Sequence, residues 1–140
     1  MNIKDDVVEV TVSDYEFSNL LEDLIAEIQI KNYRITRTSH IDNIHQRPEL
    51  PGTKDISFRY YKIVEFCNLG SCAQLISANH LAGVFMPVRF VVYQALHTTR
   101  VSVAFLRPTA FARLFQSEPL LKEARQLEQD MTAILEEISA

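Results

Sequence analysis

Cys67 is the residue whose type and position most clearly suggest chemistry. It follows residues 57–66, whose aromatic and β-branched content is typical of a β-strand, and precedes Asn68 and Ser71, which are suited to cap a helix over residues 71–80. The unpaired N–H groups and the positive dipole end of a helix lower the pKa of a nearby thiol and favour its thiolate. Cys67 could then act as a nucleophile, form a mixed disulfide or carry sulfur.

Cys67 also has a purely structural interpretation. Cysteine is among the most buried residue types, so Cys67 could simply fill a tight corner between a strand and a helix. Cys72 is the only other cysteine of the chain, and we expect it to face the core. A Cys67–Cys72 disulfide is not expected, because the cytoplasmic compartment that we predict below is reducing.

Positive charge gathers in the centre of the sequence. The net charge of −4 divides into −7 over residues 1–30, +7 over residues 31–113 and −4 over residues 114–140. Either acidic helices cover a sheet whose bases pair with them, or the bases form a pocket for an anionic small molecule. Aromatic residues could line such a pocket near Cys67, although core packing explains them equally well. The candidate ligand-binding residues are Asn68, Arg59, Arg89 and Tyr61.

Several function classes lack their usual signals. The negative total charge and the absence of a basic run with interleaved aromatics argue against a nucleic-acid partner. Three glycines provide neither a phosphate loop nor a dinucleotide fingerprint, and Gly-x-Ser-x-Gly is missing, so the sequence leans against an enzyme. His40 and His45 could in principle collect a metal or haem iron with Cys67, but no ligand spacing supports this. We therefore expect no metal and no cofactor.

Hydrophobic periodicity predicts an α+β fold. The expected strands are residues 7–12, 33–41, 57–66, 86–95 and 100–106, and the expected helices are residues 17–28, 71–80, a short one from Pro108 and a last one from Ser117. This gives a single domain, residues 1–140, with an antiparallel sheet of about five strands, helices mainly on one face and the order β-α-β-β-α-β-β-α-α.

Three local features refine this prediction. Ser13 and Glu16 form a capping box before the first helix, and residues 42–56, which contain Pro48 and Pro51, form a long loop. Residues 86–95 are apolar on both sides, which indicates a central strand or a sheet that packs on a second copy of the chain.

The compartment follows from what the sequence lacks. No apolar run approaches the ~20 residues that span a bilayer, and residues 1–12 lack the apolar core of a signal peptide. We therefore expect a cytoplasmic protein with no membrane span.

Several segments occur in an order that is typical of one known family. They are the amphipathic helix from Phe17 to Ile28, Cys67-Asn68-Leu69 at a strand end, the helix just after it, Gly83-Val-Phe-Met-Pro87 before an apolar strand, and the helix from Leu120 to Ile138. Over roughly residues 9–138 the chain thus resembles the domain-of-unknown-function 302 family of small bacterial and archaeal proteins. The resemblance implies a compact, dimeric α+β domain and no particular reaction. Leu69 replaces the family's usual proline, and Val88 stands where many members carry a second cysteine.

Two functional hypotheses follow. In the first, the protein is a non-catalytic homodimeric binding module that holds a small ligand, an anionic one being an option, or a partner protein near Cys67 and the 42–56 loop. In the second, it is a thiol-dependent redox or sulfur-carrier protein, in which Cys67 is the catalytic residue.

Overall fold

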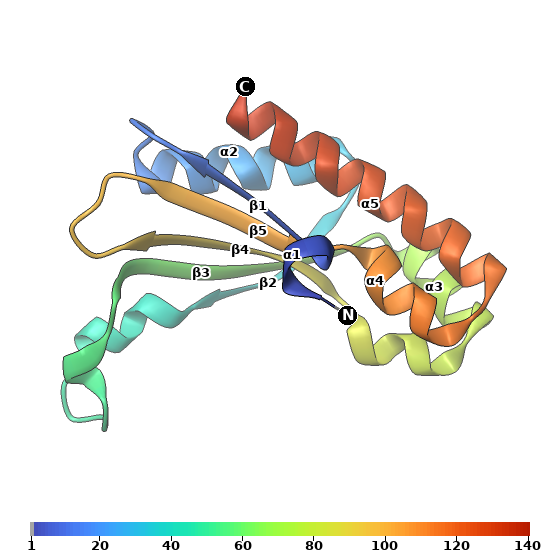
Figure 1. Cartoon of the computed structure of the whole chain (residues 1–140), viewed down its shortest axis with the longest axis horizontal. Coiled ribbons are helices and arrows are strands. Elements are labelled where there is room, and N and C mark those ends of the chain that lie inside the picture. The colour runs from blue at the N-terminus through green and yellow to red at the C-terminus, as the bar shows by residue number, and fades with distance from the viewer. Residues whose placement is uncertain (1) are drawn as a thin grey trace.

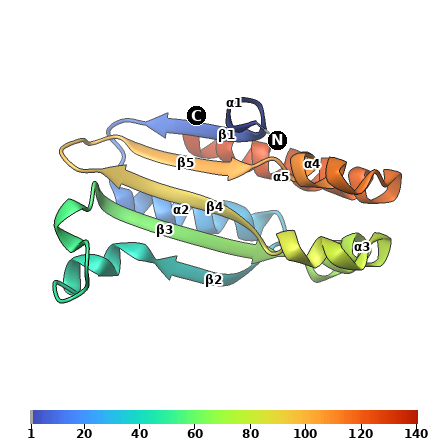
Figure 2. The same cartoon turned by 60° about the horizontal axis from the view of Figure 1, so that its bottom comes forward.

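Five strands form one antiparallel sheet in this computed structural model, which describes residues 2–140. The strands are β1 (Val7–Val12), β2 (Arg34–His40), β3 (Phe58–Cys67), β4 (Val88–Ala95) and β5 (Val101–Leu106). Their order across the sheet is β1-β5-β4-β3-β2, and all four neighbouring pairs run antiparallel (Figure 2). The α+β class with a five-stranded antiparallel sheet is therefore confirmed.

The two long helices cover one face of this sheet. The α-helices are α1 (Ile3–Asp6), α2 (Phe17–Ile30), α3 (Leu69–Ala78), α4 (Pro108–Ala112) and α5 (Glu118–Ser139), and the short 3-10 helices are η1 (Ile41–Gln46), η2 (Thr53–Asp55), η3 (His80–Phe85) and η4 (Arg113–Phe115). Figures 1 and 2 show α2 and α5 side by side on one face, while α3 and α4 lie beyond one end of the strands. The expectation of helices mainly on one face is confirmed. Among the described residues, no helix has both the length and the apolar character that a bilayer span requires.

The core lies between the two long helices and the face that they cover. Helix α2 buries four residues of its apolar stripe, namely Phe17, Leu20, Leu24 and Ile28. Helix α5 buries Leu120, Ala124, Leu127, Met131, Ile134 and Ile138, whose alternating spacing of four and three residues places them on one side of the helix. The sheet supplies Val64, Phe66, Phe90, Val92, Val101, Val103 and Phe105 from the same side. We call this side the covered face and the opposite side the open face.

Strand β4 occupies the centre of the sheet, as its apolar character on both sides predicts. It is paired with β3 on one side and with β5 on the other. Its residues Val88, Phe90 and Val92 are buried on the covered face. Val91 and Tyr93 lie on the open face, which Figure 2 shows in front and which no helix within residues 2–140 covers.

One local prediction is wrong. Ser13 and Glu16 do not form a capping box, because α2 begins at Phe17 and its N-cap residue, Glu16, makes no side-chain hydrogen bond to the helix. Asp14 lies between them in the left-handed region, with φ of 58°. The chain therefore turns before the helix instead of entering it at Ser13.

Candidate ligand-binding site

The residues predicted to form one site lie at opposite ends of β3. Arg59 is near the start of this strand, beside the 42–56 loop, whereas Cys67 is its last residue. At ~3.3 Å per residue, Arg59 and Cys67 are about 26 Å apart. Figure 2 shows the loop with η1 and η2 at one end of the sheet and α3 at the other. The prediction of a single site near both Cys67 and the 42–56 loop is therefore wrong.

The Cys67 corner is closed by a second cysteine. The structure joins Cys67 to Cys72 in a disulfide, with Cα atoms 6.7 Å apart, and leaves no free cysteine among the described residues. This corrects the prediction that the two cysteines stay unpaired. A reducing compartment was the physical basis of that prediction, whereas the first turn of α3 brings the two side chains together. The crevice beside them has a volume of about 10 Å³, which is room for no more than a single water.

Asn68 has a structural role at this corner. Its side-chain oxygen accepts a hydrogen bond from the backbone N–H of Ser71, 3.1 Å away, and so caps α3 as the sequence predicts. Its side-chain nitrogen donates to the carbonyl oxygen of Asn32, which lies in the left-handed conformation that ends α2. Both hydrogen-bonding groups of Asn68 thus have partners within the chain.

Arg89 and Tyr61 belong to a third place, the open face. Arg89 pairs with Glu65 across β3 and β4, with nitrogen and oxygen 3.6 Å apart. The ring of Tyr61 stacks on that of Tyr93, with centroids 5.6 Å apart. The structure therefore separates Arg89 and Tyr61 from Arg59, and also from the Cys67 corner.

The 42–56 loop is anchored to the sheet from within. Asp42 is buried, accepts a hydrogen bond from the backbone N–H of Tyr61 and pairs with Lys62 at 2.9 Å. The Nε2 atom of His45 lies 2.9 Å from the carbonyl oxygen of Phe58. Within residues 2–140, no three histidine, cysteine or carboxylate side chains come together as metal ligands would.

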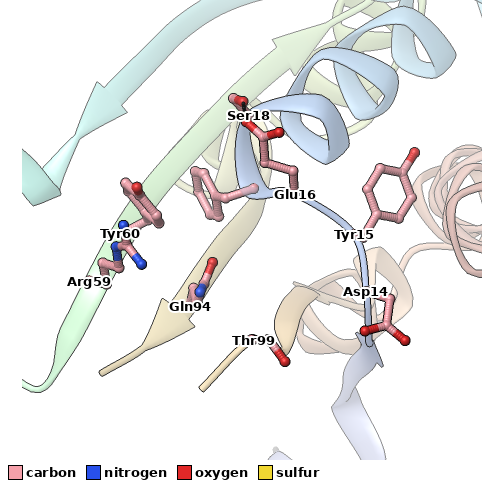
Figure 3. A pocket seen from close by; sticks show the side chains of 9 residues that line it. Asp14, Tyr15, Glu16, Ser18, Arg59, Tyr60, Gln94 and Thr99 are labelled. Atoms are coloured by element: carbon pink, nitrogen blue, oxygen red, sulfur yellow. Dashed lines mark hydrogen bonds between the residues drawn. The ribbon is translucent and has the colours of Figure 1, made fainter. Parts of the chain in front are cut away.

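A cleft at the loop end of the sheet brings polar groups together around three aromatic rings. It has a volume of about 510 Å³ and is lined by Asp14, Tyr15, Glu16, Phe17, Ser18, Arg59, Tyr60, Gln94 and Thr99. In Figure 3, Arg59 and Tyr60 come from β3 on one side, and Asp14 comes from the β1–α2 connection on the other. Of the predicted site residues, only Arg59 lines this cleft.

A β-bulge at Arg59 interrupts β3 beside the cleft. Phe58 pairs with Ala95 and Tyr60 pairs with Gln94, so Arg59 is an extra residue in β3. A bulge reverses the alternation of side chains beyond it. Phe58 consequently lies on the open face beside Tyr61. The Tyr60 ring keeps the covered face that the regular register gives it and stacks on Phe17, with centroids 4.7 Å apart.

The positive and the negative side chains of the cleft lie on opposite walls. The Arg59 guanidinium lies 5.1 Å from the centroid of the Tyr60 ring and makes no ion pair with the residues that the structure describes. Glu16 accepts a hydrogen bond from the hydroxyl of Ser18 at 2.7 Å. The Tyr15 hydroxyl donates to Asp23, and this hydrogen bond is the main reason why the pKa of Tyr15 rises to about 12. The cleft thus combines one cation, two carboxylates and an aromatic wall.

Comparisons with known proteins establish the family. The family model described as "Domain of unknown function DUF302" matches residues 8–138. The chain belongs to this family. The fold is also similar to that in the "Crystal structure of uncharacterized conserved protein DUF302 from Bacillus stearothermophilus", with a TM-score of 0.81 and 23% identity over 96% of this chain and 98% of that one. A search of curated proteins found no match.

Most of the cleft residues in this DUF302 protein were missed by sequence reasoning. Asp14 and Glu16 were assigned to the capping region of a helix, and Gln94 and Thr99 carry no motif. The bulge at Arg59 could not be recognised from the sequence either, because one extra residue in a strand still leaves a continuous stretch of residues that favour β-structure. The one usable signal was the aromatic and basic pair Arg59-Tyr60 at the start of a strand.

Proposed function

We propose that the protein is a non-catalytic binding module that works as a homodimer and holds a small molecule in the cleft beside Arg59. The observation that carries this proposal is the Arg59 guanidinium, which lies at the cleft over the Tyr60 ring without an ion-pair partner among the described residues. The planar fork of arginine donors matches a carboxylate or phosphate group, and an adjacent aromatic ring favours a fixed orientation of the guanidinium.

The opposite wall limits which anions fit. Asp14 and Glu16 would repel a ligand that carries negative charge throughout. Their oxygens instead suit hydroxyl or amino groups, which donate hydrogen bonds. The proposed ligand therefore has an anionic group at one end and hydrogen-bond donors at the other. The volume of about 510 Å³ falls within the range of small-molecule sites.

Two arginine variants test the cleft. Native mass spectrometry of the gently purified protein looks for bound small molecules, and isothermal titration with a panel of α-amino acids and hydroxy-carboxylates looks for binding directly. We expect Arg59→Ala to lose the bound molecule and to weaken binding at least tenfold. Arg125→Ala is the matched control and should behave as the wild type, since Arg125 lies on the exposed side of α5, away from the cleft and from the open face. Equal binding by wild type and Arg59→Ala would reject the cleft, as would a wild type that carries and binds nothing.

The homodimer and the cytoplasmic location complete the proposal. The homodimer is supported by the open face, where the Tyr61 and Tyr93 rings are only half-buried. A cytoplasmic location is supported by the sequence composition, which lacks a long apolar run.

The thiol-dependent alternative is favoured by the contact between Cys67 and Cys72. Reduction of this disulfide would convert it to two thiols with two electrons and two protons from a dithiol partner, which would itself become a disulfide. After treatment with a reductant, iodoacetamide labelling of Cys67 against pH should show a midpoint well below ~8.5. An ordinary midpoint would remove this alternative without affecting the cleft.

A further inference from the structure

The open face of the sheet has an apolar centre. Register pairs place Ala104, Val91 and Ile63 side by side on β5, β4 and β3. The next row toward the loop end contains the stacked rings of Tyr93 and Tyr61. All these residues lie on the side away from α2 and α5, which Figure 2 shows without a covering helix. An antiparallel sheet tolerates one solvated face when that face is polar, so an aliphatic and aromatic centre indicates a partner.

The two edges of the open face carry opposite charges. Glu9 lies on the β1 edge, in the same row as Val91 and Ala104. Arg37 lies on the β2 edge, one row further toward the Cys67 end, opposite Glu65. Both side chains are exposed, and Arg37 makes no ion pair with the residues that the structure describes. One carboxylate oxygen of Glu9 accepts a hydrogen bond from the Tyr93 hydroxyl at 2.6 Å, which holds the carboxylate toward the open face.

The charge pattern is complementary to itself under one symmetry. Strand β4 is central, so β1 and β2 lie at equal distances on either side, about 10 Å away at ~4.8 Å per strand. A two-fold axis between two facing sheets, parallel to β4, therefore puts β1 of one copy over β2 of the other. Each Glu9 then lies opposite the partner's Ser39 and one row, ~7 Å along the strand, from the partner's Arg37. Two long charged side chains can span this diagonal, and the contact occurs twice. A two-fold axis across the strands would instead put Glu9 against the same residue of the second copy.

Arg89 is the cation nearest to this proposed axis. It is on β4 and would face the partner's Arg89, but each copy holds a Glu65 carboxylate 3.6 Å from its own guanidinium. The two Arg89 and two Glu65 side chains near the axis then carry no net charge together. Sheets that pack face to face with nearly aligned strands are a common arrangement, which this axis produces.

We propose that two copies of this chain pair through their open faces, with β4 over β4 and with Glu9 of each copy against Arg37 of its partner. This inference rests on the homodimer in the proposed function and adds the surface and the orientation. It is independent of the cleft beside Arg59, which lies on the covered side of the bulge.

Charge reversal tests the orientation. The measurement is sedimentation equilibrium of the full chain over a range of concentrations at low salt, with far-UV circular dichroism to confirm folding. We expect a wild-type dimer, and we expect Glu9→Arg or Arg37→Glu alone to raise its dissociation constant at least tenfold, because like charges then face each other twice. The double variant Glu9→Arg/Arg37→Glu should return to within about threefold of the wild type, since it restores both pairs. Arg125→Glu, on the exposed side of α5, is the matched control and should have no effect.

The outcomes separate this inference from the proposed function. A wild type that stays monomeric at every concentration removes the homodimer and this inference together. A dimer that tolerates both single reversals, or that the double variant fails to restore, overturns only the surface and orientation. Val91→Arg provides a second check, because a cation at the centre of the interface should dissociate the dimer while a partly exposed position keeps the monomer folded. A dimer that persists in this variant also overturns the inference.

Discussion

The hydrogen bond between Tyr33 and Asp130 joins the start of β2 to α5. The Tyr33 hydroxyl donates to an Asp130 carboxylate oxygen at 2.7 Å, and the Tyr33 side chain is buried with its ring edge against Phe66. The substitution Tyr33→Phe keeps the ring and removes only the hydroxyl. A hydrogen bond to a charged group contributes ~1.5–3 kcal/mol, and we expect the lower end because water can reach the half-exposed Asp130.

The expected loss is therefore about 1.5 kcal/mol in the free energy of unfolding at neutral pH. For 140 residues, at ~2.1 cal/mol/K of unfolding entropy per residue, this corresponds to a Tm about 5 °C lower. Urea unfolding followed by far-UV circular dichroism is the suitable assay, because the chain contains no tryptophan. Tyr15→Phe is the matched control, because the hydroxyl of Tyr15 donates to Asp23 at the exposed surface, and it should change stability by less than about 0.5 kcal/mol.

The same bond makes the effect depend on pH. Burial, and then the hydrogen bond to Asp130, raise the pKa of Tyr33 above its ordinary value of 10. The unfolded chain therefore loses the tyrosine proton first as the pH rises. The contribution of Tyr33 to stability is complete below pH ~10 and declines as the pH rises above ~10 toward the raised pKa. The difference in the free energy of unfolding between wild type and Tyr33→Phe should therefore be smaller at pH ~11 than at pH 7. A difference below about 0.3 kcal/mol at pH 7, or one of equal size at both pH values, would refute this reasoning.

Two further perturbations test the core and the amino-terminal turn. Leu24 is fully buried, so Leu24→Ala should lower the free energy of unfolding in urea by ~2–5 kcal/mol. Leu69 is 84% exposed, so Leu69→Ala should change that free energy by no more than about 0.5 kcal/mol. Equal losses in the two variants would contradict the packing of the core. The backbone N–H of Asn2, followed by the guanidinium of Arg113, lowers the pKa of Asp6, so the contribution of Asp6 to stability is present above pH ~4 and is lost as the pH falls through the lowered pKa. Asp6→Asn should therefore be less stable than wild type at pH 7 and equally stable at pH ~2, and a constant difference between them would disprove this linkage.

Most of the fold could be predicted because the pattern of apolar residues is strong. The four-and-three spacing in α2 and α5 identified the buried stripes, and β4 was recognised as central from apolar residues on both of its sides. These signals are local in the sequence, so they need no knowledge of the tertiary structure. The start of α2 was predicted wrongly, because Asp14 adopts a left-handed turn that competes with the capping box at Ser13.

The site could not be predicted to the same extent, because it depends on distances between elements. The distance between Arg59 and Cys67 cannot be read from residue types, and β3 places the two residues near its opposite ends. The cleft arises where the β1–α2 connection meets a bulge in β3, and neither feature marks the other in the sequence. Only the register of the folded sheet brings Gln94 beside Tyr60.

The position of β1 has a consequence for synthesis on the ribosome. Strands β2, β3, β4 and β5 are neighbours in chain order, so each hairpin can close soon after its second strand emerges. Strand β1 emerges first, but Val12 must wait for Val101 and Val7 for Leu106. Strand β1 thus stays unpaired on the nascent chain until β5 has emerged, and the sheet is completed only when its first strand docks on its last.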